Sequence, residues 1–387
     1  MATRRSTRLI FGAMTGTSID ALDVAAVRVR GRALGIKGEL LSTHSVTLGD
    51  LVPRLRAAQR QEPMTAGEFA ALARDLALAH IEPFLELSRR HGVPDLAVVH
   101  GQTLYHAPPV SLQLIEPGVI AHALSCEVIA NLRAADLAAG GQGAPITPLA
   151  DWMMFRSRTS ARFVVNLGGF ANATYLPSGP PALAAWIDGI RGFDLCLCNQ
   201  LLDHLARTKA NRPFDAEGSL AEQGRTDPSA LATVGGLLSA QRESRRSLGT
   251  RDELFEAIDR ATARLTAADA LATGVESIAA VVARALAETL ADSAEPRRTV
   301  VLLAGGGTRN RALVAAIAAA CGHRTALTDS LGVGAEAREA MAMALLGAAR
   351  HDGCEITLPA VTGRGSSLRA GKESQQEAPS FTESSHG

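Results

Sequence analysis

Three short apolar runs in this chain each end at a turn of small residues, and this pattern constrains the fold most strongly. The three junctions lie at residues 9–18, 162–169 and 299–307. Apolar runs of this length between turn residues are typical of buried strands. Stretches rich in Ala, Leu, Arg and Glu separate them, with apolar residues at the three-to-four spacing of helices. Strands that alternate with helices predict an α/β fold with ligand chemistry at the strand ends.

Two predicted β-hairpins and a set of helices complete this pattern. Residues 9–29 are predicted to form a β-hairpin with a hydroxyl-rich tip, and residues 162–176 repeat this arrangement near the midpoint of the chain. The repeat indicates two related halves. Helices are predicted at 65–90, 199–207, 275–291, 310–320 and 336–349, the first entered through a Thr65–Glu68 capping box. Further strands are predicted at 96–99, 128–131 and in the apolar stretch 182–190.

The charge of the chain excludes several classes of protein. It has 39 Lys and Arg against 39 Asp and Glu, and the lysines among them are Lys37, Lys209 and Lys372. A neutral chain without basic runs lacks the cluster of positive charge that binds nucleic acid or an anionic membrane. A Gly-Lys phosphate loop and a protein-kinase site each need a lysine in a context that these three do not provide. Any nucleotide phosphates must therefore be held by glycines, backbone amides and carboxylates.

Length and cysteine usage indicate a globular protein of a reducing compartment. The 387 residues suffice for two to three domains, or for two halves that share a cleft. Five cysteines at scattered spacings form no disulfide framework and fit the cytoplasm. No run of 18 apolar residues and no signal-peptide core occurs, so no membrane span is expected. Residues 371–387 are rich in Ser, Glu and Gln and are predicted to be a disordered tail.

Two of the small-residue turns are candidates for binding anions. Near Gly16, small residues let backbone amides approach a phosphate, neighbouring hydroxyls add donors, and Asp20 or Asp23 could hold Mg²⁺. The alternative is an ordinary glycine hairpin with Asp20 as a turn acceptor. Residues 305–307 lie between a strand and a helix, whose N-terminal amides would point at a ligand. The alternative there is a tight strand–helix turn.

Two side chains are candidates for chemistry. Asp194, in Gly192-Phe193-Asp194, lies between a predicted strand and a predicted helix, where it could act as a general base or as a helix N-cap. His100 follows the predicted strand 96–99 and is either functional or a satisfied core histidine. Cys196 and Cys198 lack the two further ligands that zinc needs.

Seven short motifs occur in a fixed order over nearly all of residues 8–370. They are Gly12-Ala-Met-Thr-Gly-Thr-Ser-Ile-Asp20, His100-Gly-Gln-Thr103, Gly140-Gly-Gln-Gly-Ala-Pro145, Asn166-Leu-Gly-Gly-Phe-Ala-Asn172, Gly192-Phe-Asp194, Gly305-Gly-Gly-Thr-Arg-Asn310 and Val361-Thr-Gly363. Together, in order and spacing, they resemble the anhydro-N-acetylmuramic acid kinase family. The resemblance implies a two-lobed sugar-kinase, heat-shock-protein and actin-like (ribonuclease H-like) α/β fold, with duplicated halves and ATP in the cleft between them.

The resemblance also implies an activity. Members phosphorylate 1,6-anhydro-N-acetylmuramic acid with ATP and Mg²⁺, and water opens the ring to give N-acetylmuramic acid 6-phosphate, a cytoplasmic step of cell-wall recycling. The implied partners are the sugar and ATP, with no nucleic acid or membrane, and members resemble homodimers. Residues 1–130 with 336–370 are expected to form one lobe, and residues 131–335 the other.

The family's roles carry over onto matching positions of this chain. Asp194 matches the base that deprotonates the attacking water, and Asp20 is the implied metal ligand. His100, Gln102 and Arg133 are the implied sugar contacts. The implied nucleotide contacts are Gly16, Thr17, Ser18, Ile19, Asp20, Ala21, Leu22, Asp23, Gly168, Gly169, Gly305, Gly306, Gly307 and Asn310.

Four segments depart from the family pattern. Leu195-Cys196-Leu197-Cys198 replaces Thr-Gly-Pro-Gly, Asn131 to Ala135 loses one acid and two arginines, Ile115-Glu116 replaces Gly-Asp, and Ala21 replaces a glycine. If these segments all face one cleft, side chains fill space that glycine leaves open and anion recognition is lost. Two alternatives to the implied activity therefore stand: a kinase for a different sugar, and a catalytically impaired relative that binds nucleotide or regulates.

Overall fold

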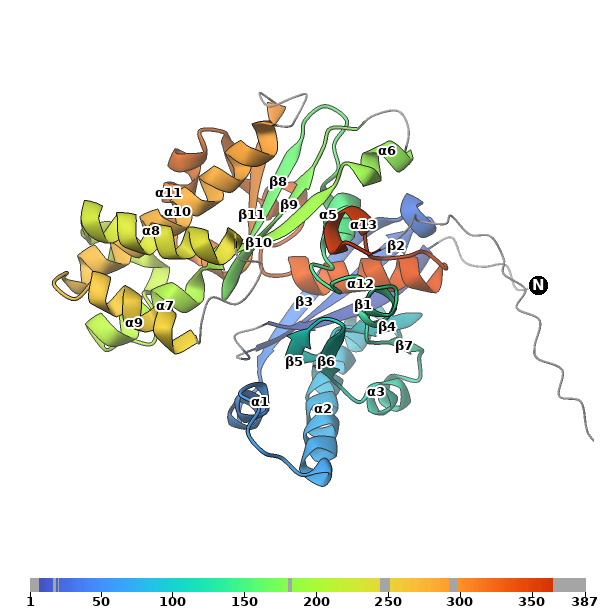
Figure 1. Ribbon diagram of the computed structural model, residues 1–387. Coiled ribbons are helices and arrows are strands. Elements are labelled where there is room, and N and C mark those ends of the chain that lie inside the picture. The colour runs from blue at the N-terminus through green and yellow to red at the C-terminus, as the bar shows by residue number, and fades with distance from the viewer. Residues whose placement is uncertain are drawn as a thin grey trace, which may run out of the picture.

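Two five-stranded sheets form the centre of the molecule (Figure 1). The computed structural model describes residues 7–16, 19, 21–179, 183–243, 251–291 and 298–364. The first sheet has the order β3-β2-β1-β4-β7, and the second has the order β10-β9-β8-β11-β12. Their bounds are β1 Thr7–Thr15, β2 Ala21–Arg30, β3 Lys37–Thr47, β4 Leu96–Val99, β7 Val128–Ile129, β8 Arg162–Leu167, β9 Phe170–Leu176, β10 Arg191–Leu197, β11 Val300–Ala304 and β12 Arg324–Leu327.

The two sheets have the same topology, which confirms the prediction of two related halves. In each, three consecutive strands form an antiparallel meander, β1–β2–β3 in the first sheet and β8–β9–β10 in the second. In each, the first strand of the meander also pairs in parallel with the strand that follows the meander in the chain, β4 or β11. A last short strand, β7 or β12, then continues the parallel part. The chain is therefore the two-lobed, duplicated α/β fold that the sequence predicted.

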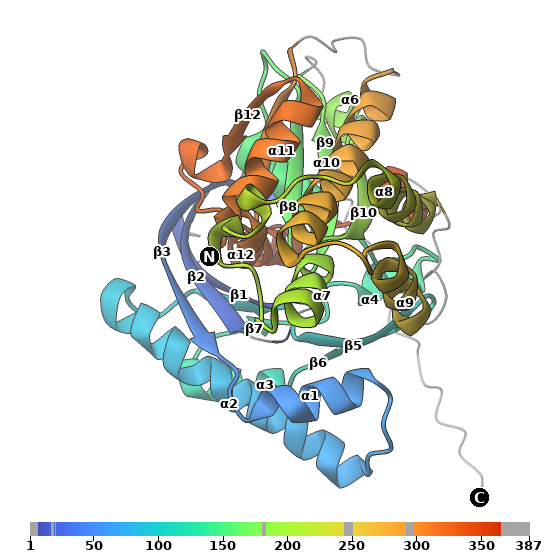
Figure 2. The same ribbon diagram turned by 90° about the vertical axis from the view of Figure 1, so that its left-hand side faces the viewer.

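The helices form layers outside and between the sheets (Figures 1 and 2). Helices α1, α2 and α3 cover the outer face of the first sheet, and α7 to α11 cover the outer face of the second. Helices α5 and α12 pack in the core between the two sheets. Their bounds are α1 Leu51–Gln59, α2 Ala66–His91, α3 Pro117–Leu124, α4 Ala134–Ala138, α5 Pro148–Phe155, α6 Leu183–Asp188, α7 Asn199–Ala210, α8 Pro228–Glu243, α9 Arg251–Ala261, α10 Ala267–Ala291, α11 Arg311–Cys321, α12 Arg338–His351 and α13 Pro359–Thr362.

Side-chain alternation explains this layering. Along β1, Ile10 faces the core between the lobes, whereas Phe11 and Ala13 face the outer core under α2. Such strands are buried on both faces and read as continuous apolar runs, because helices cover both sides. At Gly12 the backbone of α12 crosses so closely that an added β-carbon would come within 2.0 Å of the Ala340 carbonyl oxygen. Only glycine permits this approach of helix to strand.

Several boundaries follow the prediction and others do not. The Thr65–Glu68 capping box is present at the start of α2. The stretch 182–190 was predicted as a strand and is wrong, since α6 occupies Leu183–Asp188 and the strand begins at Arg191. The hairpin of β5 Gln102–Ala107 and β6 Val110–Leu114 was not predicted. The lobe boundaries proposed from the sequence stay predictions, and residues 371–387 lie outside the described part of the chain.

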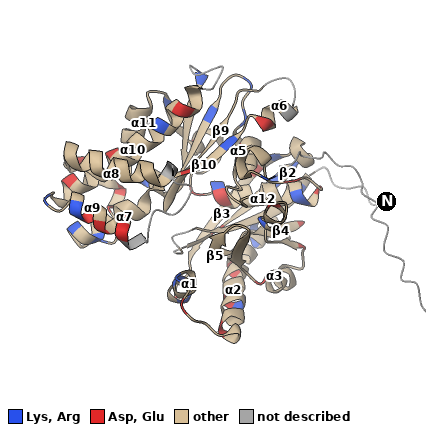
Figure 3. Cartoon of the chain, viewed as in Figure 1, with Lys and Arg blue, Asp and Glu red and all other residues tan. Residues whose placement is uncertain are grey.

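Helix α10 is long and apolar enough to span a membrane by length and composition. However, 72% of its apolar window is buried inside the protein, as in the core helix of a globular domain. It is the single such helix among the residues that the structure describes. Basic and acidic residues are interleaved along the helices of both lobes (Figure 3).

The buried His80 predicts acid sensitivity of the fold. His80 is fully buried in α2, its Nδ1–H donates to the Leu76 carbonyl oxygen over 2.7 Å, and its Nε2 has no partner within the described part of the chain. Burial lowers the pKa of His80 to about 4. The unfolded chain therefore binds this proton more readily, and the free energy of unfolding falls as pH falls from about 6.5 to about 4. Between pH 7 and 5 the loss due to His80 is expected to be about 2 kcal/mol, measured by urea unfolding.

A His80→Leu variant removes this titration and should show a shallower loss of unfolding free energy over the same range. The exposed His122 serves as the control, and His122→Ala should keep the wild-type pH dependence. An unchanged slope in His80→Leu would contradict the role of His80.

Candidate active site

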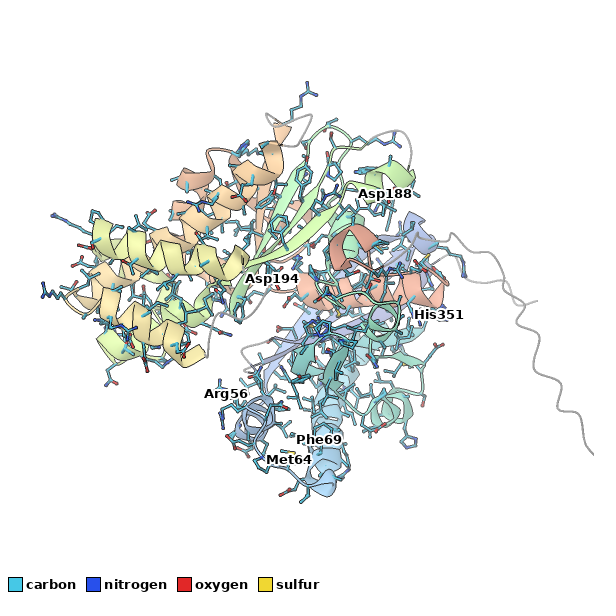
Figure 4. The ribbon with its side chains drawn as sticks, viewed as in Figure 1. Arg56, Met64, Phe69, Asp188, Asp194 and His351 are labelled. Carbon is cyan, nitrogen blue, oxygen red and sulfur yellow. The ribbon has the colours of Figure 1, made fainter. Side chains whose placement is uncertain are left out.

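Four polar side chains from distant parts of the sequence interact in one region. They are His100, Arg133, Asp194 and Glu339. Asp194 is on β10 and lies on the part of the second lobe that faces the first (Figure 4). Glu339 is in the first turn of α12, the helix between the two sheets. The site is therefore built from both lobes.

Asp194 keeps access to solvent, although many protein atoms surround it. It pairs with Asn172 in the sheet, and a β-bulge follows between Asp194 and Cys196. Bulges change the direction of a side chain and are frequent next to active sites. The surrounding protein raises the pKa of the Asp194 carboxyl, and the Arg133 guanidinium offsets part of this rise. A carboxylate with a raised pKa, open to water, can accept a proton from water.

Arg133 is hydrogen-bonded to His100 and interacts electrostatically with Asp194. Its Nε–H donates to His100 Nε2 over 3.2 Å, and its Nη1 donates to the Gly143 carbonyl oxygen over 3.2 Å. Burial lowers the pKa of Arg133 to about 10, while Asp194 and Glu339 favour its charged form. The guanidinium therefore stays cationic at neutral pH.

His100 is buried and neutral. Its Nδ1–H donates to the Gly101 carbonyl oxygen over 2.9 Å, which leaves Nε2 as the acceptor for Arg133. Burial, together with the positive charge of Arg133, lowers the pKa of His100 to about 3. His100 is thus hydrogen-bonded in the core and also contacts Arg133 directly. It has features of both interpretations offered by the sequence, a core histidine and a functional one. Gln102 is buried as well, and its Oε1 has no partner among the described residues.

Glu339 is a candidate site residue that the sequence reasoning missed. Its Oε1 accepts a hydrogen bond from Asn166 Nδ2 over 3.3 Å. Burial raises the pKa of Glu339, as do the nearby carboxylates of Asp23 and Asp151, whereas Arg338 and Arg133 lower it. The residue lies in an Ala- and Met-rich helix, where the sequence pattern predicts only burial. A charge in the first turn of that helix was the one signal that could have identified it.

The β1–β2 hairpin is described only in part. Thr17, Ser18 and Asp20, three of the predicted phosphate or metal contacts, lie outside the described residues. Ile19 has a positive φ of 61° and its side chain is fully buried, as is that of Leu22. Gly16, Ala21 and Asp23 retain some exposure. Ile19 and Leu22 can therefore contribute backbone atoms rather than side chains to nucleotide binding, and their predicted role stays a prediction.

The two predicted glycine turns of the second lobe lie against each other. Gly168 and Gly169 connect β8 to β9, and the Gly168 carbonyl oxygen accepts the backbone N–H of Asn199 over 3.1 Å at the start of α7. Gly305 has a φ of +87°, and an added β-carbon there would come within 2.8 Å of the Leu167 carbonyl oxygen. At Gly306, by contrast, no atom of the described residues lies within 4 Å of an added β-carbon. The fold thus requires glycine at 305, whereas residue 306 leaves open space.

Asn310 does not present its oxygen to a ligand. Its Oδ1 accepts the backbone N–H of Leu313 over 2.9 Å and caps α11, and the residue is buried. The cap of α11 uses this oxygen, and the predicted nucleotide contact of Asn310 stays a prediction.

Two departures from the family pattern do not alter the site as the sequence suggested. Cys196 and Cys198 are buried in the core of the second lobe under α7 and α10, and burial raises the pKa of both thiols. They do not fill space beside Asp194. Glu116 caps α3, where its Oε1 accepts the Gly118 N–H over 3.2 Å.

The two positions at which the family has arginine, Ala134 and Ala135, also lie away from the four site side chains. Ala134 and Ala135 are exposed and line a pocket of about 250 Å³ together with Arg350, Glu355 and Arg364. None of His100, Arg133, Asp194 or Glu339 lines this pocket. The expectation that all four altered segments face one cleft is therefore wrong.

Within the described ranges, no group of three or more His, Cys, Asp or Glu is arranged to hold a metal ion. Mg²⁺ prefers one or two carboxylates together with phosphate oxygens, so a smaller set suffices for it. Asp23 and Glu339 interact electrostatically and are oxygen donors of this kind.

Comparisons with known proteins agree with the motifs. A family model described as anhydro-N-acetylmuramic acid kinase matches residues 8–373. The anhydro-N-acetylmuramic acid kinase of Gloeobacter violaceus is 33% identical over 377 residues, covering 94% of this chain and 97% of that protein. The protein of the same name from Bordetella petrii is 35% identical over 372 residues, covering 92% and 93%.

Among solved structures, similarity is distant. The activator of the 2-hydroxyisocaproyl-CoA dehydratase from Clostridium difficile, with bound ADPNP, is 14% identical with a TM-score of 0.44, covering 89% of this chain and 96% of that one.

Proposed function

The chain belongs to the anhydro-N-acetylmuramic acid kinase family and is a kinase that phosphorylates a sugar, and on this premise we propose that it converts 1,6-anhydro-N-acetylmuramic acid to N-acetylmuramic acid 6-phosphate. ATP is the phosphoryl donor. The proposed setting is the cytoplasm, where the reaction returns cell-wall sugar to metabolism. The observation that carries the proposal is Asp194, a solvent-accessible carboxylate with a raised pKa beside the Arg133 cation.

The proposed reaction uses Asp194 as the base. Asp194 takes a proton from water, whose oxygen bonds to the anomeric carbon while the bond from that carbon to the 6-oxygen breaks. The released 6-oxygen then attacks the γ-phosphorus, and the bond to the ADP leaving group breaks. Arg133 keeps Asp194 ionised and places positive charge beside the reacting groups. Phosphoryl transfer needs little more than positioning and charge neutralisation.

We propose that the glycine turns of the second lobe bind the nucleotide. The open side of Gly306 and the neighbouring turn at Gly168 leave backbone that phosphate oxygens could approach. Asp23 and Glu339 would hold Mg²⁺, with Asp20 as a further candidate outside the described residues. When bound, Mg²⁺ neutralises charge on the phosphates.

The test is a coupled ADP-release assay with 1,6-anhydro-N-acetylmuramic acid, run beside N-acetylmuramic acid and N-acetylglucosamine. ADP release with the anhydro sugar, and the appearance of the 6-phosphate product, would support the proposal. Turnover of another sugar alone would indicate a changed substrate. A thermal shift with Mg-ATP but no turnover on any sugar would indicate a binding or regulatory relative.

A pair of glycine variants tests the nucleotide site. Gly306→Ala should fold normally, because open space surrounds the new β-carbon, and should raise the KM for ATP about tenfold. The KM for the sugar should not change. Gly305→Ala is the matched control for packing, and it should lower the melting temperature because its β-carbon meets Leu167. An unchanged KM for ATP in Gly306→Ala would place the phosphates elsewhere.

A further inference from the structure

We infer that Asp136 and Thr362 form a positioning pair that fixes Arg133 and Asp194 relative to each other, an inference that rests on the proposed function. Neither residue contacts the four site side chains directly. Asp136 is in α4 and Thr362 ends α13, near the C-terminal limit of the described chain. Both are buried, at 1% exposure each.

The pair fastens the loop between α4 and α5 to α13. Asp136 Oδ1 accepts the Thr362 hydroxyl over 2.7 Å, and Asp136 Oδ2 accepts the Gly143 backbone N–H over 2.7 Å. The Gln142 backbone N–H donates to the Thr362 carbonyl oxygen over 2.8 Å. A carboxylate that accepts two hydrogen bonds in a buried place fixes both donors strongly.

The fastened loop contacts the site on two sides. Gly143, whose N–H bonds to Asp136, uses its carbonyl oxygen to accept a hydrogen bond from Arg133 Nη1. On the other side, Pro145, Pro148 and Val361 surround Gly192 so closely that a β-carbon there would come within 3.2 Å of each. Gly192 lies two residues before Asp194 on β10. The hydrogen-bonded unit around Asp136 and Thr362 therefore fixes the position of the Arg133 cation and also that of β10, the strand that carries Asp194.

Misplacement of reacting groups by about an ångström is costly, so loosening this unit should reduce turnover. Thr362→Val keeps the shape of the side chain and removes the hydroxyl. We expect kcat/KM to fall about tenfold, mainly through kcat. Thr362→Ser retains the hydroxyl and should restore most of the activity. Thr299→Val is the matched control, because the buried Thr299 hydroxyl has no partner among the described residues and lies outside the site.

The pH dependence distinguishes positioning from a general loss of stability. Arg133 lowers the pKa of Asp194, and Arg133 itself faces Asp194, Glu339, His100 and His106. If Arg133 moves away, the pKa of Asp194 rises. The acidic limb of kcat/KM should therefore shift to higher pH in Thr362→Val, but not in Thr299→Val.

Asp136→Asn provides a second variant, since its amide cannot accept both hydrogen bonds at once. Arg364 Nε lies 3.7 Å from Asp136 Oδ1 and could replace the lost hydroxyl in Thr362→Val, but Asp136→Asn removes the charge that attracts it. Wild-type kcat/KM and an unshifted acidic limb in both variants would overturn the inference.

A readout without substrate separates this inference from the proposed function. Hydrogen–deuterium exchange should rise over residues 140–147 and 191–197 in Thr362→Val and Asp136→Asn, and should stay at the wild-type level in Thr362→Ser. If the wild type consumes no ATP with the anhydro sugar, the proposed function fails while the exchange result still decides the coupling. Unchanged exchange in both variants would overturn it.

Discussion

Replacing Asp194 by Asn is expected to lower kcat about 1000-fold, because a general base contributes roughly 10² to 10⁴ to the rate. Asn has nearly the same shape but cannot accept the proton of the attacking water. The KM for ATP should change little, since Asp194 acts at the sugar. The measurement is steady-state ADP release with the anhydro sugar over a range of pH.

The wild-type pH profile supplies an independent check on the same residue. The base must be ionised to act, so kcat/KM should fall as pH falls through the pKa of Asp194. Because the surrounding protein raises this pKa, the midpoint of the fall should lie above the ordinary pKa of an aspartate. The exposed Asp188, at the end of α6 (Figure 4), is the control, and Asp188→Asn should keep the wild-type kcat. A kcat in Asp194→Asn within twofold of the wild type would show that another group is the base.

The second large effect concerns the buried ion pair between α5 and α12. Arg338 and Asp151 are 1% and 0% exposed, and Arg338 Nε donates to Asp151 Oδ1 over 2.7 Å. The Thr174 hydroxyl donates to Asp151 Oδ2 and the Thr147 hydroxyl accepts from Arg338 Nη2, whereas Arg338 Nη1 has no hydrogen-bond partner among the described residues. Removing one partner leaves a buried charge uncompensated, so Arg338→Met is expected to reduce the free energy of unfolding by about 3–5 kcal/mol. Urea denaturation measures this loss.

The double variant tests the explanation. Asp151→Leu with Arg338→Met removes both charges and should be less destabilised than either single variant, since no unpaired charge stays buried. The exposed pair Glu86–Arg90 is the control, and Arg90→Ala should cost less than about 1 kcal/mol. Additive losses in the double variant would show that packing, rather than charge, causes the instability. Arg338→Met should also reduce activity, because Glu339 is the next residue of α12.

Local patterns made much of the fold predictable. The apolar runs that end at glycines became β1, β8 and β11, and Thr65 caps the start of α2 as predicted. These features depend on neighbours in the sequence, which a single chain displays directly. The repeat of the hairpin also predicted the duplicated topology.

Features that depend on long-range packing were less accessible. Glu339 joins the site only because α12 docks between the two sheets, and nothing in its own helix indicates this. The cysteines after Asp194 suggested a blocked cleft, but the bulge between Asp194 and Cys196 directs the site residue outward while the thiols stay in the core. The stretch 182–190 is apolar enough for a strand, yet it forms α6 because its tryptophan packs edge-on against Trp152 of α5.

The place of α12 in the chain affects how the molecule must be made. Helix α12 ends at His351, yet it packs against β1 and β2, which are synthesised first. The inner face of the first sheet therefore has no cover while most of the chain is still being translated. Domains that form from continuous chain fold as they emerge, whereas the first sheet gains its inner cover only after α12 has been made. The second sheet and its outer helices α7 to α11 lie within residues 162–327 and are free to fold earlier, so a ribosome-bound nascent chain passes through a stage in which the first sheet is still open.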